Sequence, residues 1–222
     1  PALLYNTPMQ QLSLLQILAV AAIPVLFAIT LHEVAHGWVA RRFGDRTAEM
    51  LGRLSVNPLK HIDPIGTVIV PALALMTTGF LFGWAKPVPV AMRNLHNPRR
   101  DMMFVAAAGP GANLIMALFW AFFTKLVVVS GLDGMTAQFF LTMGQIGVFI
   151  NVILAVFNMV PIPPLDGGRV LSGLLPPRAS TRLDALEPYG LIIVLAFIFF
   201  AWGYLRPVIA SVTSFFMSIA GL

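Results

Sequence analysis

Five consecutive residues, His32-Glu33-Val34-Ala35-His36, lie near the end of a long apolar run and combine two imidazoles with a carboxylate. On a helix the two histidines lie one turn apart on the same face, and both can bind one Zn²⁺ ion. Glu33 would then lie beside the open coordination position, as a base for a water molecule there. Each ionisable group costs roughly 3 kcal/mol at membrane depth, so this pattern within apolar sequence favours a functional role.

A third ligand must come from elsewhere in the chain, because catalytic zinc usually takes three protein ligands. The chain has no cysteine, which leaves histidine and carboxylates. The strongest candidate is Asp166, which follows a proline-rich break at residues 161–164 where an apolar helix must end. Gly167 and Gly168 allow a tight turn, so the carboxylate can point back into a helix bundle. Asp166 could instead be a simple turn residue, since Asp-Gly is a common turn pair.

A third polar element is Asn113, in the segment Ala108-Gly-Pro-Gly-Ala-Asn113. Small residues let neighbouring helices approach closely, and an amide inside a membrane bundle usually bonds across helices or lines a site. Asn113 could therefore donate to an oxyanion or serve only as an interhelical hydrogen bond.

The elements that hold these residues must be membrane helices. Of the 222 residues, 58% are hydrophobic and 10% are charged, against roughly 25% charged in a soluble domain. Since a span needs about 20 apolar residues, we expect core helices near 12–42, 102–130 and 138–160 and peripheral helices at 189–205 and 207–222. The sequence predicts an all-α polytopic membrane protein with about five full spans, a single domain over residues 1–222.

The basic residues indicate an orientation in the membrane rather than nucleic-acid binding. All but Lys125 and Arg206 of the fourteen Lys and Arg residues fall in three segments between the apolar stretches. If these segments face the cytoplasm, the loop 131–137 faces outward. The apolar stretch 65–84 then has both ends on one side, which predicts a re-entrant element; the alternative is an ordinary further span.

Together the motifs resemble the site-2 protease family of intramembrane zinc metalloproteases, peptidase family M50. The family has H-E-x-x-H on one helix, G-P-x-x-N on the next core helix and N-x-x-P-x-x-x-x-D-G on the third, and this chain matches them in order from about Ala19 to Leu171. The segments 52–66 and 83–90 resemble its compact branch, which lacks a PDZ domain.

The resemblance implies one Zn²⁺ per chain, bound by His32, His36 and Asp166, with Glu33 as general base and acid. Asn113 and Asn158 match family asparagines near the site, with a role in substrate or oxyanion contact or only in hydrogen bonding between helices. The implied fold is a three-helix catalytic core plus peripheral helices.

The resemblance also implies an activity and a place in the cell. The expected enzyme is an intramembrane zinc endopeptidase that cuts within or next to the transmembrane segments of membrane proteins, in regulated intramembrane proteolysis. We expect it in a bacterial or archaeal cell membrane, with the active site towards the cytoplasm and no nucleic-acid partner.

Two further expectations concern substrates and a rival function. Residues 49–56 and 86–91 could form a small cytoplasmic-side β element whose edge pairs with an unwound substrate, or could simply cover the inner membrane face. The rival function is a non-catalytic membrane protein that binds or carries metal ions. A carrier would need polar residues across the bilayer, and the last two expected helices offer almost none.

Overall fold

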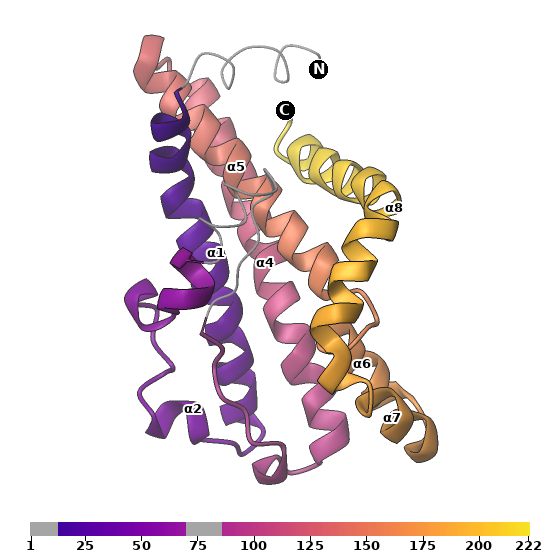
Figure 1. The fold of residues 1–222 in the computed structure, drawn as a ribbon. Helices are drawn as coiled ribbons and strands as arrows, with labels where there is room; N and C mark the ends of the chain where they lie inside the picture. Colours follow the sequence, from indigo (N-terminus) through magenta and orange to yellow (C-terminus); the bar gives the residue numbers. More distant parts are fainter. Residues whose placement is uncertain (1–12, 70–85) are drawn as a thin grey trace.

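The computed structural model describes residues 13–69 and 86–222, which form a bundle of long helices (Figure 1). The long helices are α1 (Leu14–Arg42), α4 (Pro98–Val129), α5 (Gly134–Asn158) and α8 (Gly190–Ile219). The short elements are α2 (Thr47–Met50), η2 (Pro58–Lys60), η3 (Pro64–Ile69), η4 (Met92–Asn94), α6 (Asp166–Leu174), α7 (Pro177–Asp184) and η5 (Glu187–Tyr189).

Local sequence explains where the core helices begin. Ser13 caps α1 in a capping box with Gln16, in which Ser13 Oγ accepts from the Gln16 N–H and the Gln16 side chain accepts from the Ser13 N–H. Pro98 starts α4, and the carboxylate of Asp101 accepts the N–H of Asn97 at 2.6 Å. The observed core helices match the predicted ranges to within four residues at each end.

Helix α4 lies at the centre of the bundle and contacts α1, α5, α6 and α8. Close packing of α4 and α5 depends on two small residues, because a Cβ on Gly144 would overlap Thr124 and one on Gly147 would overlap the ring of Trp120. A buried apolar cluster lies between α1, α4, α5 and α8. It includes Val20, Met116, Ala117, Trp120, Val148, Val152 and Ile209.

The C-terminal part differs from the prediction of two peripheral helices. Residues 190–219 form one helix with Pro207 inside it, and Figure 1 shows α8 bending along its length. Proline removes one helical hydrogen bond and bends the helix without having to end it. In the described part of the chain, four helical stretches are long and apolar enough to cross a membrane, α1, α4, α5 and Pro177–Ile219 with α8, rather than about five.

The expected β element is absent from residues 13–69 and 86–222, which contain no strand. Glu49 lies in α2, and residues 86–91 have no regular secondary structure and no strand partner in the described part of the chain. Of the predicted re-entrant stretch 65–84, residues 65–69 belong to the π-helical η3, and residues 70–84 lie outside the described part of the chain.

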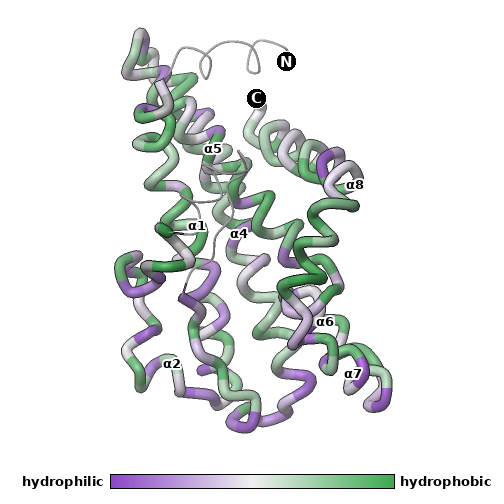
Figure 2. The backbone as a smooth tube through the Cα atoms, viewed as in Figure 1, coloured by the Kyte–Doolittle hydropathy of each residue, from purple (hydrophilic) through white to green (hydrophobic). Residues whose placement is uncertain are grey.

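Polar residues gather at one end of the bundle. Figure 2 shows the long helices mostly green, with purple segments concentrated where α1 ends and α4 begins and around α2 and α7. Most of the arginines lie at this end, among them Arg41, Arg42, Arg46, Arg53, Arg93, Arg99, Arg100, Arg178 and Arg182.

Candidate metal centre

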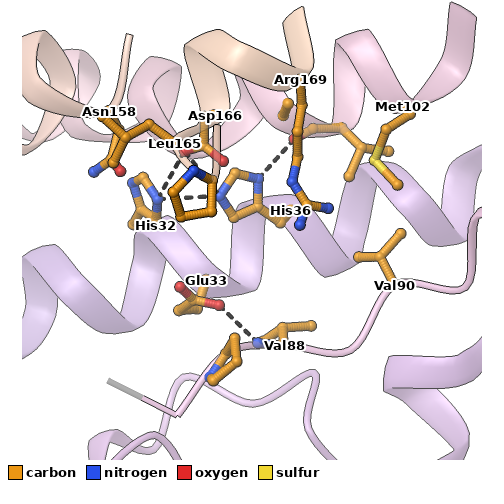
Figure 3. A pocket seen from close by; sticks show the side chains of 14 residues that line it. His32, Glu33, His36, Val88, Val90, Met102, Asn158, Leu165, Asp166 and Arg169 are labelled. Carbon is orange, nitrogen blue, oxygen red and sulfur yellow. Dashed lines mark hydrogen bonds and ion pairs between the residues drawn. The ribbon is translucent and has the colours of Figure 1, made fainter. Parts of the chain in front are cut away.

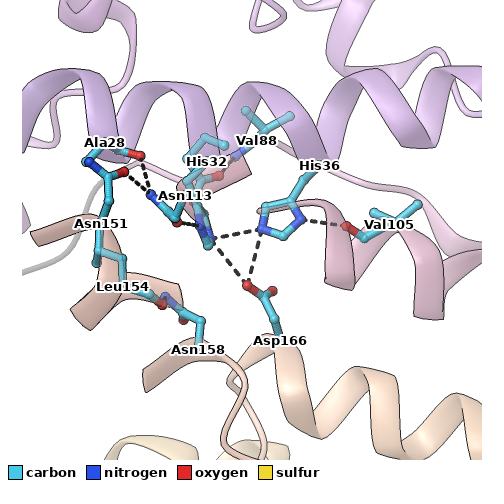
Figure 4. Close-up of polar contacts among 11 residues, drawn as sticks. Ala28, His32, His36, Val88, Val105, Asn113, Asn151, Leu154, Asn158 and Asp166 are labelled. Atoms are coloured by element: carbon cyan, nitrogen blue, oxygen red, sulfur yellow. Dashed lines mark hydrogen bonds and ion pairs between the residues drawn. The ribbon is translucent and has the colours of Figure 1, made fainter. Parts of the chain in front are cut away.

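Three side chains from two distant parts of the sequence meet between α1 and the start of α6. His32 Nε2 lies 3.2 Å and His36 Nε2 3.4 Å from Asp166 Oδ2, and the two Nε2 atoms are 3.0 Å apart. Figure 4 shows both imidazoles pointing at the carboxylate. The histidines are about nine-tenths buried, and Asp166 Oδ2 is buried without a hydrogen-bond partner among the described residues.

The other ring nitrogens of the histidines fix which atoms face this centre. His36 Nδ1 lies 2.7 Å from the carbonyl oxygen of Val105, and His32 Nδ1 lies 2.6 Å from Asn113 Oδ1. Both partners are oxygen acceptors, so each Nδ1 must carry the hydrogen and donate it. Each Nε2 is therefore a bare lone pair, the form in which imidazole binds metals.

A cation fits this arrangement well. With both imidazoles neutral, two nitrogen lone pairs and a carboxylate oxygen converge on one point, which is the donor set that a cation requires. A tetrahedral zinc ion with bonds of about 2.0–2.1 Å separates its ligand atoms by about 3.3 Å, close to the three observed separations of 3.0, 3.2 and 3.4 Å. His32, His36 and Asp166 could thus hold one zinc ion and leave a position open for water.

The sequence around Gly109 provides the space that the imidazoles need. A Cβ on Gly109 would overlap Nε2 of His36 and would lie 2.6 Å from Cε1 of His32. The histidine rings therefore pack directly on the α4 backbone, and only glycine leaves room for them. The small residues of this segment were predicted to allow close helix packing. The structure shows that the groups packed against Gly109 are the rings of His32 and His36.

Asp166 is positioned by the break after α5. Residues 159–165 form a compact loop in which the N–H of Leu165 donates to the carbonyl of Ile162, and α6 begins at Asp166 itself. Gly167 and Gly168 lie inside α6 without positive φ, so they do not form the expected turn. They matter for space, since a Cβ on Gly168 would lie 2.6 Å from the backbone carbon of Ile162.

Glu33 faces a different part of the molecule. Its Oε2 accepts the N–H of Val88 at 2.7 Å, and Figure 3 shows Glu33 pointing towards Val88 while the imidazoles point to Asp166. Val88 belongs to the strap, our name for residues 86–96, which crosses α1 at this point. Val88 is packed tightly, since a Cβ on Gly37 would lie 2.8 Å from Val88 Cγ1.

Hydrogen bonds to side chains and to the backbone hold the strap in place along its length. Asp45, which is buried just after α1, accepts the N–H of Ala91 at 2.7 Å and the side-chain amide of Asn94 at 3.0 Å. Arg53 donates to the carbonyl of Lys86 at 3.0 Å. At the far end the N–H of His96 donates to the carbonyl of Phe43.

A pocket of about 380 Å³ joins the two sides of the site. Its lining includes the three metal-facing side chains, Glu33 and, from the strap, Val88 and Val90. Metal ligands, a carboxylate and an open space for substrate are therefore contiguous, as hydrolysis at a metal requires.

The two predicted asparagines occupy different places. Asn158, the last residue of α5, lines the pocket, and its amide donates to the carbonyl of Leu154 in its own helix at 3.0 Å. Asn113 is fully buried, and its amide nitrogen donates to the carbonyl of Ala28 at 3.1 Å and to Asn151 Oδ1 at 2.9 Å. Both donor hydrogens of Asn113 are used in hydrogen bonds to other helices, as in the second of the two predicted roles, and donation to an oxyanion stays a prediction.

Sequence reasoning missed Asn151. It is fully buried in α5, and its amide nitrogen donates to the carbonyl of Gly147 at 2.8 Å. The available signal was an amide in an otherwise apolar run, two helical turns before Asn158. An unpaired amide is costly inside a bilayer, so such a residue calls for a partner.

Apolar membrane-length helices around a buried His, His, Asp cluster define a membrane protein with a metallopeptidase-type centre. The sequence profile of "Peptidase family M50" matches residues 20–140 and 125–201. The chain belongs to peptidase family M50.

Named relatives agree with this assignment. "Putative zinc metalloprotease YwhC" of Bacillus subtilis (strain 168) is 38% identical over 187 residues, which cover 82% of this chain and 80% of that protein. "Putative zinc metalloprotease Rip2" of Mycolicibacterium smegmatis is 32% identical over 170 residues, which cover 77% of this chain and 62% of Rip2, less than two thirds of its length. Rip2 of Mycobacterium tuberculosis (strain H37Rv) is 28% identical over the same shares.

No solved structure matches the chain significantly. Family membership, the relatives' names and the clustered ligands together make the protein a zinc metallopeptidase of the membrane. The predicted family, enzyme class and cofactor are thereby confirmed.

Proposed function

We propose that the protein is an intramembrane endopeptidase, which hydrolyses peptide bonds within or next to the transmembrane segments of other membrane proteins. The observation that carries the proposal is the convergence of His32, His36 and Asp166 within an apolar bundle, beside a pocket that also contains Glu33. A peptide bond must reach this pocket from the lipid or from the nearby membrane surface.

In this proposal His32, His36 and Asp166 are the zinc ligands. When bound, zinc supplies Lewis acidity, which lowers the pKa of water towards about 7 and polarises a peptide carbonyl. The ligands come from one helix turn and from the first residue of α6, both held by backbone packing. The site is therefore formed before substrate arrives.

Glu33 is the proposed proton carrier. It takes a proton from the attacking water and returns it to the leaving amine. The bond from the Val88 N–H holds one carboxylate oxygen and so restricts the side chain to one side of the pocket. Asn158 lines the pocket and is the proposed asparagine for contact with the substrate or the oxyanion.

A helical substrate must unwind before its carbonyl can reach the centre, because helical backbone groups already bond one another. The strap offers limited backbone pairing to an unwound segment. The N–H groups of Lys86, Val88 and Ala91 already have acceptors, and Pro87 and Pro89 have none. Within residues 86–91, the backbone groups without a partner in the described part of the chain are the N–H of Val90 and the carbonyls of residues 88–90, so strand addition there would be short.

The proposed location is a bacterial cell membrane with the site towards the cytoplasm. The relatives are bacterial proteins. The two histidine ligands lie on the half of α1 nearer its C-terminal end, where Arg41 and Arg42 follow. Basic residues mark the cytoplasmic side of membrane proteins, which supports water access from that side.

The test uses purified protein reconstituted in vesicles with a library of single-span peptides labelled at both ends. For Glu33→Gln we expect cleavage to fall by at least about 100-fold, the scale of general acid–base catalysis, with zinc per chain unchanged by elemental analysis. His36→Ala should lose both zinc and cleavage. Glu49→Gln is the matched control, because Glu49 pairs with Arg41 and Arg46 at the surface.

Cleavage by Glu33→Gln at the wild-type rate would remove Glu33 from the mechanism. Mass spectrometry of the products tests the rest of the proposal. Cuts placed only in water-soluble flanks, far from the membrane segment, would leave a zinc peptidase that is not intramembrane.

A further inference from the structure

A chain of hydrogen bonds runs from α5 through α4 to the metal-facing histidine of α1. It begins at the carbonyl of Gly147, which accepts from Asn151 Nδ2 at 2.8 Å. Asn151 Oδ1 accepts from Asn113 Nδ2 at 2.9 Å, and Asn113 Oδ1 accepts from His32 Nδ1 at 2.6 Å. Figure 4 shows Asn151, Asn113 and His32 in this order.

The direction of this chain is set by a backbone group that cannot change its role. A carbonyl oxygen only accepts, so Asn151 must turn its NH₂ to Gly147 and its oxygen to Asn113. Asn113 must then turn its NH₂ to Asn151, where it also reaches the carbonyl of Ala28 at 3.1 Å. Its oxygen faces His32, and His32 must donate from Nδ1.

Both asparagines are fully buried, so bulk solvent does not compete for their hydrogen bonds. Without Asn151, the orientation of Asn113 depends on the single acceptor at Ala28. The reversed Asn113 amide would present NH₂ to His32 Nδ1 and favour the tautomer with hydrogen on Nε2. In that tautomer Nε2, the atom that faces the metal site, has no lone pair to offer a metal ion.

We propose that Asn151 is a positioning residue for the zinc site, which through Asn113 holds His32 in the tautomer and ring orientation that present Nε2 to the metal. Asn151 is not among the residues that line the pocket, and its side chain bonds Gly147 and Asn113 rather than His36 or Asp166. The proposal rests on His32 being a zinc ligand, as proposed above. Outer partners of metal ligands typically change metal affinity by about 10–100-fold.

The experiment measures the zinc dissociation constant of the purified full chain by competition with a chelator. Asn151→Leu, which has similar volume but no amide, should weaken zinc binding about tenfold, and Asn113→Leu about 10–100-fold. The double variant should be no weaker than Asn113→Leu alone, because both changes break the same chain. Asn151→Asp keeps an acceptor for Asn113 and should recover most of the affinity.

The matched control is Thr142→Val in the same helix. It removes a fully buried hydroxyl, and this hydroxyl has no hydrogen-bond partner among the described residues. It should leave zinc affinity unchanged. If Asn151→Leu does not accumulate as folded protein, Asn151→Ser, whose shorter side chain cannot reach Asn113, carries the same comparison.

A second measurement reads the tautomer directly. The chain has four histidines, so a ¹⁵N-histidine NMR spectrum can be assigned by single substitutions. The zinc-loaded protein should show His32 protonated at Nδ1, and Asn151→Leu should show a second His32 form with hydrogen on Nε2.

The outcomes separate this inference from the proposed function. If His32→Ala binds zinc as tightly as the wild type, the ligand assignment itself fails. If His32→Ala loses zinc but Asn151→Leu binds it as tightly as the wild type, with an unchanged His32 signal, the positioning role of Asn151 is overturned while the proposed function stands.

Discussion

His32 and Glu33 are neighbours in the chain, yet they are held by different kinds of structure. His32 is fixed by buried helix-to-helix hydrogen bonds through Asn113. Glu33 is bonded to Val88 in the strap, an irregular segment with exposed residues on both sides of that valine. The metal-binding side of the site is thus built into the bundle, whereas the side that carries protons depends on a surface segment.

This difference indicates which substitutions should change zinc binding and which should change only activity or stability. Substitutions in the bundle should alter zinc binding and activity together. Substitutions in the strap should alter activity or stability and leave zinc in place.

The largest effect should come from Gly109→Ala. The added Cβ would occupy the space of the His36 and His32 rings, and α4 cannot move away without disturbing its packing on α5. We expect zinc affinity and cleavage to fall by about 100-fold or more, beyond the usual effect of an outer partner. Gly111→Ala is the control, since nothing lies within 4 Å of its added Cβ. Full zinc occupancy in Gly109→Ala would contradict the packing described here.

Asp45→Asn should loosen the strap. Burial raises the pKa of Asp45, but hydrogen bonds from Thr47, Asn94 and the Ala91 N–H outweigh it and hold the pKa below its ordinary value. An amide cannot accept all these bonds, so we expect a loss of about 2 kcal/mol in the free energy of unfolding at pH 7, the scale of hydrogen bonds to a charged group. Denaturation of the detergent-solubilised protein measures it, with zinc occupancy unchanged in the folded state.

The same substitution has a defined pH dependence. A carboxyl group with a depressed pKa in the folded protein stabilises it fully above the unfolded value and less as pH falls through the folded value. The difference in unfolding free energy between wild type and Asp45→Asn should therefore be constant from pH 7 to pH 5 and shrink below about pH 4. Carboxyl groups elsewhere titrate in both proteins and cancel. A difference that stays constant down to pH 3 would refute this account of Asp45.

Val88→Pro removes the N–H that Glu33 accepts. We expect cleavage to fall about tenfold, a part of the full contribution of acid–base catalysis, while zinc affinity is unchanged. Val88→Ala keeps the N–H and removes the packing on Gly37, so it separates the hydrogen bond from the packing. Equal loss of activity in both variants would mean that packing, not the N–H, supports Glu33.

The smallest effect should come from Arg53→Gln. Arg53 is only partly buried, and its bonds to the carbonyls of Lys86 and Pro87 lie at the surface. We expect a change of less than about 0.5 kcal/mol in the free energy of unfolding and wild-type zinc content. A loss as large as that of Asp45→Asn would show that the strap is anchored mainly at its first residues.

Much of the fold could be predicted because membrane helices depend on local sequence. Apolar length, Pro98 and the proline-rich break after Asn158 place the ends of the core helices. Two features could not be read in this way. Pro207 lies within α8 instead of separating two helices, since a bend in a helix and its end have the same local signal. Residues 49–56 were predicted to be part of a β element, but the first two belong to helix α2. A short polar segment lacks the clear periodicity that distinguishes a strand from a helix.

By itself the sequence determined that this is a membrane metallopeptidase with His32, His36 and Asp166 as candidate ligands, because residue type and helical spacing set which chemistry is available. The packed structure alone shows that Asn113 bonds His32, that Asn151 bonds Asn113, and that Glu33 accepts the N–H of Val88. The physical reason is that donors and acceptors 38 to 85 residues apart choose their partners only when the packed helices bring them together.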